Sequence, residues 1–331
     1  MKKIMLFCSF LFFGVPVIAS AHVKWFIDAH EVTKNLHSQT PLYTWGSTEV
    51  LTWSIIVLCV VVFFGFLDAK VPTPTRLLKF GLAHERQIRR VAQTLLGLFL
   101  ISVSFLWKII IVPDFHIVGT MGLVLGALQV LVGLMYTVNW KPQIASAILF
   151  FLTIGVTLSF GVGALLENAL LVSLALYFFI IHAPKDSFIS TRLEKHSVEI
   201  VRIGTGISLI VLAFTEKILF PELSLSFLDV HHWNFMQQLF PWFTNNLFVL
   251  STGFAEMIFG ILFIMGYLTR TTTVLIALFF ALSVVTMLVN FNMWEVEDLV
   301  VYAAAILFIF FGHGKTKFFH FIWPNSKLQR S

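Results

Sequence analysis

Residues 245–270, NNLFVLSTGFAEMIFGILFIMGYLTR, hold a single acidic or basic side chain, Glu256, before the closing Arg270. Residues 245–267 form one apolar run, and a helix needs about 20 such residues to cross the hydrocarbon core of a bilayer. Similar runs recur near 50–67, 91–111, 116–138, 143–163, 165–182, 198–220, 271–290 and 297–312. The sequence therefore predicts an all-α polytopic membrane protein with about nine transmembrane helices.

The composition excludes most soluble classes of protein. Of the 331 residues, 58% are hydrophobic and 12% are charged, and the mean hydropathy is +0.90. Soluble globular chains carry about 25% charged residues. A water-soluble enzyme, a nucleic-acid-binding domain and a disordered chain are therefore excluded, and the expected partner is the lipid bilayer. The net charge of +5 does not indicate nucleic-acid binding, because the basic residues lie in short loops between apolar runs.

The amino terminus, residues 1–21, has the pattern of a secretory signal peptide. A basic start and an apolar stretch precede the small tripeptide Ala-Ser-Ala at 19–21, which is typical of a cleavage site. An uncleaved signal anchor is the alternative. After cleavage, residues 22–48 would form a periplasmic segment and Cys59 would be the remaining cysteine. A thiol relay needs a second thiol, so we expect Cys59 to pack as a small apolar residue.

The charges of the loops predict the orientation. With the mature amino terminus in the periplasm, almost every Lys and Arg in the loops falls on the cytoplasmic side, as the positive-inside rule requires. Loop 221–244 contains no Lys or Arg and segment 290–298 is acidic, so both belong outside. We expect a bacterial inner-membrane protein with a cytoplasmic carboxyl-terminal tail at 316–331. The aromatic-rich loop 221–244 is expected to lie at the outer interface.

The chain also contains an internal duplication. Residues 126–185 match 253–315, with several polar residues in the same order. The matched pairs are Gly126 and Gly253, Gln129 and Glu256, Gly133 and Gly260, Glu167-Asn168 and Glu297-Asp298, and His182 and His313. Two four-helix units, 90–185 and 198–315, are therefore predicted behind one extra transmembrane helix at 49–68. Each unit begins and ends on the cytoplasmic side, so the repeats are parallel.

Short motifs connect the second unit with a known family. The motifs are EKILFP at 216–221, G-x-x-E-x-x-x-G at 253–260 and GYLTR at 266–270. This unit resembles the DoxX-like family of four-helix membrane proteins, which includes the membrane subunit of thiosulfate:quinone oxidoreductase. The first unit departs from the pattern at Gln129 and at 139–141, and the resemblance leaves 22–48 and 221–244 unexplained. It implies a four-helix fold and a redox-associated role.

Glu256 is the strongest candidate for a functional side chain, since an ionisable group at a helix centre costs about 2.5–3.5 kcal/mol on insertion scales. Gly253 and Gly260 lie on its helical face and let a neighbouring helix approach. Two interpretations remain open. Glu256 handles protons or binds a ligand, or it is an interhelical anchor that is protonated or paired with Lys217 or Arg202. The predicted buried polar centre consists of Glu256, Lys217, Arg202 and Glu216.

Two further polar groups are expected on the periplasmic side. An acidic group, Glu295, Glu297 and Asp298, precedes the last helix, where acidic side chains also complement the helix dipole. Cleavage after the signal peptide would make His22 amino-terminal, and its α-amine and imidazole are donors suited to copper. The histidines that would complete such a metal site are His30, His37, His231 and His232. Each of them also has the ordinary interpretation of a surface residue.

Three functions stay open on the sequence. No phosphate-binding loop, dinucleotide motif, nucleophile elbow or zincin motif occurs, so we expect no ATP-driven pump and no catalysis by the chain alone. The first function is a subunit of a redox-associated or quinone-linked complex, with a periplasmic or membrane redox partner, as the resemblance implies. The second is a periplasmic copper-handling protein. The third is a proton-coupled transporter of a small molecule that uses Glu256.

Overall fold

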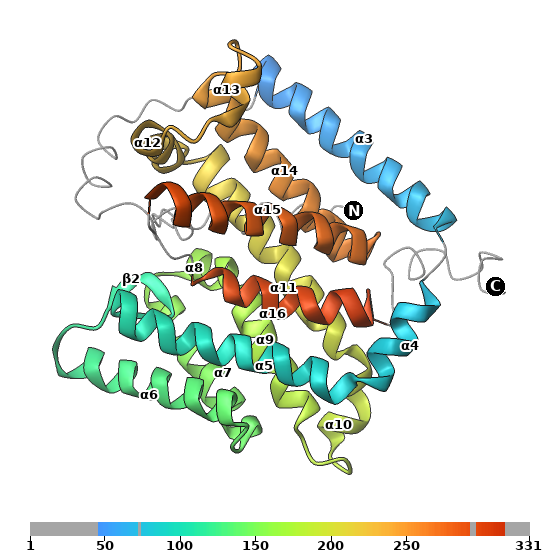
Figure 1. Cartoon of the computed structure of the whole chain (residues 1–331), viewed down its shortest axis with the longest axis vertical. Coiled ribbons are helices and arrows are strands. Elements are labelled where there is room, and N and C mark those ends of the chain that lie inside the picture. Colours follow the sequence, from blue (N-terminus) through green and yellow to red (C-terminus); the bar gives the residue numbers. More distant parts are fainter. Residues whose placement is uncertain (1–45, 72–73, 292–295, 315–331) are drawn as a thin grey trace.

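The computed structural model describes residues 46–71, 74–291 and 296–314. The predicted signal peptide, the histidines at 22, 30 and 37, and the carboxyl-terminal tail lie outside these ranges. Within them, the fold is helical apart from one short hairpin (Figure 1).

An apolar helix occupies each of the predicted spans. Within the described ranges, six helices are long and apolar enough to cross a membrane. They are α3 (Thr48–Lys70), α5 (Glu85–Ser102) with its extension η2 (Val103–Trp107), α6 (Gly119–Val138), α7 (Pro142–Ser159), α11 (Ser197–Leu212) with η4 (Ala213–Ile218), and α14 (Asn245–Met265). The other apolar helices are α9 (Ala169–Ile181), α15 (Thr269–Phe291) and α16 (Asp298–Phe311). The chain is therefore built as a multi-pass membrane protein.

The predicted span 91–111 ends early. The helix stops at Trp107, where Lys108 adopts a left-handed conformation with φ 53°. Strand β1 (Ile109–Ile110) then pairs antiparallel with β2 (Val112–His116). Pro113 has no amide hydrogen and cannot continue a helix, so this apolar stretch forms a buried hairpin instead.

Short helices lie at the two ends of the bundle. Helices α8 (Val162–Glu167), α12 (Glu222–His231) and α13 (Phe235–Leu239) lie with the hairpin toward one end, and α4 (Thr75–Ala83) and α10 (Phe188–Leu193) lie toward the other (Figure 1). We call these the α12 end and the α10 end. The 3₁₀ turn η3 (Glu194–His196) leads from α10 into α11.

Two helix pairs are held together by the same close contact. A Cβ atom on Gly97 of α5 would lie 2.7 Å from the carbonyl oxygen of Gly133 in α6. A Cβ atom on Gly206 of α11 would lie 2.6 Å from the carbonyl oxygen of Gly260 in α14. Only glycine permits backbones to approach this closely, which explains the small residues at these positions.

An arginine fastens the α10 end of each pair. Arg90 donates hydrogen bonds to the carbonyl oxygens of Tyr136, at 2.8 Å, and Thr137, where α6 ends. Arg202 donates to those of Phe263 and Ile264, at 2.8 Å for Ile264, where α14 ends. Carbonyls at a helix end lack partners within the helix, and each guanidinium supplies hydrogen-bond donors to two of them.

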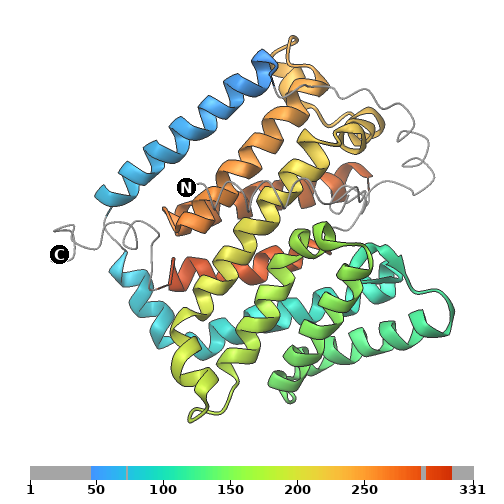
Figure 2. The same ribbon diagram turned by 180° about the vertical axis from the view of Figure 1, so that it is seen from behind.

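The remaining helices cross between the two pairs. Helix α9 packs on α7 and also on α11, while α16 packs on α15 and also on α5 (Figures 1 and 2). The largest hydrophobic core is consequently shared, with Leu100 from α5, Leu174 from α9 and Leu307 from α16 in one cluster.

Helix α3 lies at the edge of the molecule against α14 (Figure 2). Trp53 stacks on Phe254, and the Asp68 carboxylate accepts a hydrogen bond of 2.9 Å from the Leu268 amide. Cys59, expected to pack as a small apolar residue, is exposed on α3. Because α3 covers the bundle on one side only, its other apolar side chains are left for lipid.

Candidate functional site

Three charged side chains form a cluster inside the bundle. The Lys217 ammonium lies 3.0 Å from Glu256 Oε1 and 3.6 Å from Glu216 Oε2. The Glu216 side chain is fully buried, and that of Lys217 is 11% exposed. Burying an ion is costly unless it is paired, so Lys217 is held where two carboxylates surround it.

The glycines of the G-x-x-E-x-x-x-G motif make room for this cluster. A Cβ atom on Gly253 would lie 2.9 Å from Cβ of Lys217. Gly260 meets the α11 backbone at Gly206. Glu256 lies between these two glycines in sequence, so the close approach of α11 and η4 brings its carboxylate to the lysine. Lys217 itself lies in the π-helical turn η4, a geometry often found at functional sites.

Two neighbouring helices are too short to cross the bilayer alone. Helices α9 and α16 have 13 and 14 residues. At 1.5 Å per residue each spans about 20 Å, against a hydrocarbon core of about 30 Å. Glu167 and Asn168 precede α9, and Glu297 and Asp298 stand at the start of α16. These polar residues therefore stand at the starts of helices that are shorter than the hydrocarbon core.

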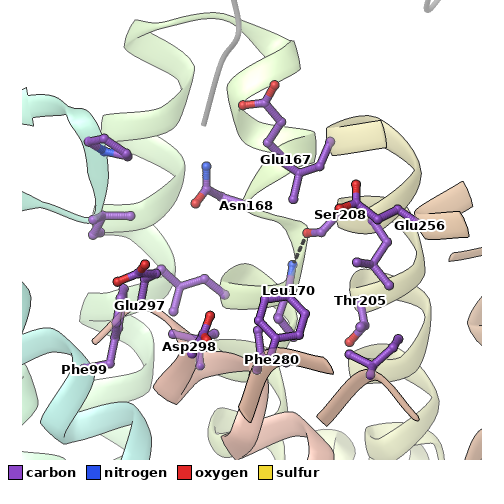
Figure 3. Close-up of a pocket in the computed structure, with 18 of the residues that line it drawn as sticks. Phe99, Glu167, Asn168, Leu170, Thr205, Ser208, Glu256, Phe280, Glu297 and Asp298 are labelled. Carbon is purple, nitrogen blue, oxygen red and sulfur yellow. Dashed lines mark hydrogen bonds between the residues drawn. The ribbon is translucent and has the colours of Figure 1, made fainter. Parts of the chain in front are cut away.

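A pocket of about 140 Å³ joins all these elements (Figure 3). Its lining contains corresponding residues from the starts of both short helices. These are Glu167 with Glu297, Asn168 with Asp298, Leu170 with Val300, and Leu171 with Val301. Lys217 and Glu256 line the same pocket. Residues that match in the repeat thus face one shared space.

Hydroxyl groups and aromatic rings complete the lining. Thr205 and Ser208 come from α11, Phe99 from α5 and Phe280 from α15 (Figure 3). Ser208 Oγ accepts a hydrogen bond of 2.9 Å from the Leu170 amide, which fastens the first turn of α9 to α11. The pocket therefore combines carboxylates, an ammonium group and hydroxyls with apolar walls, as small-molecule sites do.

The matching position in the first helix pair is neutral. Gln129 is fully buried, and its amide nitrogen donates to Leu100 O at 3.1 Å, Ser104 Oγ at 2.9 Å and Ile109 O at 3.3 Å. Lys108 is exposed. The neutral Gln129 amide thus connects α6 to the end of α5, to η2 and to β1. Glu256, in contrast, lies beside a lysine and lines a pocket.

The structure distributes the predicted site residues unequally. Glu256, Lys217 and Glu216 come together, while Arg202 lies toward the α10 end and binds backbone carbonyls of α14. Glu297 and Asp298 line the pocket, and Glu295 is outside the described residues.

Sequence reasoning missed four polar pocket residues. Glu167 and Asn168 appeared only as repeat matches, and no sequence pattern marked Thr205 and Ser208.

The predicted metal ligands are largely outside the structure. His22, His30 and His37 fall outside the described residues. His231 ends α12, and His232 follows it with an exposed side chain. Among the described residues, no group of three or more His, Cys, Asp or Glu side chains is arranged to hold a metal ion. The copper site stays a prediction.

Comparison with known protein families, with curated proteins and with solved structures gives no match to this chain.

Proposed function

We propose that the protein is a proton-coupled transporter of a small solute, with Glu256 as the proton-carrying group. The observation that carries this proposal is the Lys217–Glu256 ion pair, which opens onto a pocket at the ends of two short helices. Polar groups at membrane depth usually line substrate or proton pathways. Secondary transporters commonly bind their substrates where interrupted helices end near the middle of the bilayer.

Glu256 can gain or lose a proton while Lys217 keeps a carboxylate neighbour. When Glu256 takes up a proton, Lys217 keeps a carboxylate neighbour in Glu216, 3.6 Å away. When Glu256 releases the proton, its carboxylate pairs with Lys217 at 3.0 Å. A solute that contacts the Glu256 carboxylate in the pocket changes the stability of its ionised form. Solute binding and proton binding are therefore linked through one carboxylate.

The arrangement of helices supports a moving part. We infer that the chain consists of two parallel four-helix units, 90–185 and 198–315, related by duplication and similar to the DoxX-like fold. The Gly97–Gly133 and Gly206–Gly260 contacts support this inference, since each joins the first and second membrane helix of its unit. Movement of one unit against the other would open the pocket to alternate sides.

The orientation follows from the loop charges. We infer a bacterial inner-membrane location with the α12 end in the periplasm, because the 221–244 segment has no Lys or Arg. The pocket would then lie nearer the periplasmic face.

Proton flux tests the proposal directly. The full-length protein is reconstituted into vesicles loaded with a pH dye, and solutes of each charge class are added outside. We expect one class to drive proton movement, and we expect Glu256→Gln to abolish it. The matched control is Glu49→Gln, an exposed carboxylate on α3. Equal proton flux in the Glu256→Gln protein would refute the role of Glu256.

A quinone-linked redox subunit is the second candidate. One observation favours it: the Lys217 ammonium and the Ser208 hydroxyl line a pocket close in size to the ~150 Å³ cavity that admits benzene. These groups are hydrogen-bond donors for a quinone carbonyl. Extraction of the gently purified protein tests this candidate: a stoichiometric quinone or a co-purifying redox protein would favour it over transport.

A further inference from the structure

We propose that the solute bound in the pocket is a small organic ammonium ion. This inference rests on the proposed function and specifies the class of its substrate. The evidence is the combination of charge, size and wall chemistry in a single cavity between the two helix pairs (Figure 3).

The charges favour a cation. Among the described residues, four carboxylates line the pocket against one ammonium group: Glu167, Glu256, Glu297 and Asp298 against Lys217. The helix starts at α9 and α16 each add about half a positive charge, which leaves the ionised lining negative. In a low-dielectric site, such a lining repels an anion and stabilises a cation.

Glu256 has acceptor capacity left over. Its Oε1 atom pairs with Lys217 at 3.0 Å. Its Oε2 atom is buried and has no hydrogen-bond partner in the structure. A buried acceptor without a donor is costly, and an N–H group of a ligand in the pocket would supply that donor.

The geometry favours an organic cation over a bare metal ion. Magnesium and calcium bind six or more oxygen atoms gathered at about 2.0–2.6 Å. No trio of acidic, histidine or cysteine side chains within the described ranges is gathered in this way. An alkylammonium ion needs only a few acceptor oxygens, because it has three N–H donors that form hydrogen bonds at about 2.7–3.2 Å.

The walls and the volume fit the hydrocarbon part of such an ion. Phe99, Leu209, Ile276 and Phe280 line the pocket. Aromatic faces attract ammonium groups, and the aliphatic side chains suit a short alkyl chain. The volume of about 140 Å³ is close to that of a cavity that admits benzene. The ligand is therefore a compact amine with about six non-hydrogen atoms.

Binding of this cation would be coupled to proton release. The ammonium ion enters the pocket with its own charge, and the protonated Glu256 carboxyl gives its proton to water as the ion pair forms. Charge in the pocket is conserved, so the transport expected is an exchange of ammonium ion for proton.

Calorimetric titration of the purified full-length protein in mild detergent tests the ligand class. The probes are n-butylammonium, the neutral 1-pentanol, the anion butyrate and Mg²⁺. We expect saturable binding of n-butylammonium only, with its dissociation constant raised at least tenfold by Glu297→Gln or Asp298→Asn and unchanged by Glu49→Gln. Saturable binding of the alcohol, of butyrate or of Mg²⁺ in its place would overturn the inference.

A variant expected to bind more tightly controls for variants that lose binding only because they misfold. Asn168 occupies the place in the first unit that Asp298 occupies in the second. Asn168→Asp adds a carboxylate to the pocket, and we expect it to bind n-butylammonium several-fold more tightly. An unchanged or weaker affinity in this variant would contradict the inference.

The two proposals fail in different ways. If Glu256→Gln abolishes solute-driven proton flux but n-butylammonium does not bind, the ligand class is wrong and transport stands. If n-butylammonium binds but proton flux never responds to any solute, the pocket is a cation site and the transport proposal is wrong.

Discussion

Glu167 and Glu297 lie far apart in the sequence, yet each stands beside the start of a short helix and both line the same pocket. Each carboxylate comes from a different half of the chain. The pocket therefore exists only when both halves are assembled, because neither set of helices encloses it alone.

The charged cluster gives the first prediction. Lys217→Met removes the cation between Glu216 and Glu256, and breaking a buried pair in this way costs about 3–5 kcal/mol. We expect a clear drop in the temperature of thermal unfolding in mild detergent. The double variant Lys217→Met with Glu256→Gln leaves less uncompensated charge, so it should recover a large part of the loss. A double variant as unstable as Lys217→Met alone would show that the pair is not coupled.

The glycine contacts give the second prediction. In Gly260→Ala the new Cβ atom would lie 2.6 Å from Ile210 Cγ1 and 2.8 Å from the Gly206 carbonyl oxygen. Overpacking of this kind costs about 1–3 kcal/mol. Gly155→Ala in α7 is the matched control, since no atom lies within 4 Å of its Cβ position. We expect thermal unfolding to shift downward for Gly260→Ala and to stay equal or rise for Gly155→Ala. Equal losses in both would contradict the close helix contact.

The arginine at the end of α14 gives the third prediction. Arg202 reaches two carbonyl oxygens at once, and its guanidinium lies against Gly266, whose φ is +76°. Both bonds are donated by one guanidinium nitrogen, Nη1, and the lysine side chain is one atom too short to reach that position. We expect Arg202→Lys to lose about 1.5–3 kcal/mol, the usual worth of hydrogen bonds to a charged group. The exposed Arg76 on α4 serves as control, and Arg76→Lys should unfold at the wild-type temperature.

Copper binding gives the fourth prediction, from the sequence alone. If the signal peptide is removed after residue 21, the protein with an amino-terminal His22 should bind about one copper ion through its α-amine and imidazole. Metal analysis of the purified protein, with its amino terminus verified by mass spectrometry, measures this. His22→Ala should lose the copper. A cleaved, folded protein that takes up no copper would remove the copper-handling hypothesis.

Much of the helical framework could be predicted from the sequence, because apolar runs of membrane length have few other solutions in lipid. Glycine spacing also predicted a close helix contact at Gly253 and Gly260, since only small residues allow such an approach, but it did not identify α11 as the partner. The hairpin at 109–116 could not be predicted in the same way. Its residues are as apolar as those of a membrane helix, and only Pro113 indicates that the helix ends here.

The candidate site was harder to predict than the fold. A charged residue in an apolar run must find a partner, but the sequence does not say which one. Arg202 was placed with Glu256 on this reasoning, whereas it satisfies carbonyls at the end of α14. Glu167 could be matched with Glu297 as a repeat position. Their sharing of one pocket depends on how α9 and α16 cross between the helix pairs, which no local pattern encodes.

The crossed packing of α9 and α16 also sets an order for biogenesis. Helix α5 leaves the ribosome before its partner α16, which is made only after α6 to α15. Until then, the face of α5 that carries Leu96 and Leu100 has no permanent neighbour from the second half of the chain. Helix α5 must therefore stay in the membrane without this contact until α16 has been inserted. We expect a chain truncated before residue 298 to be degraded by quality-control proteases.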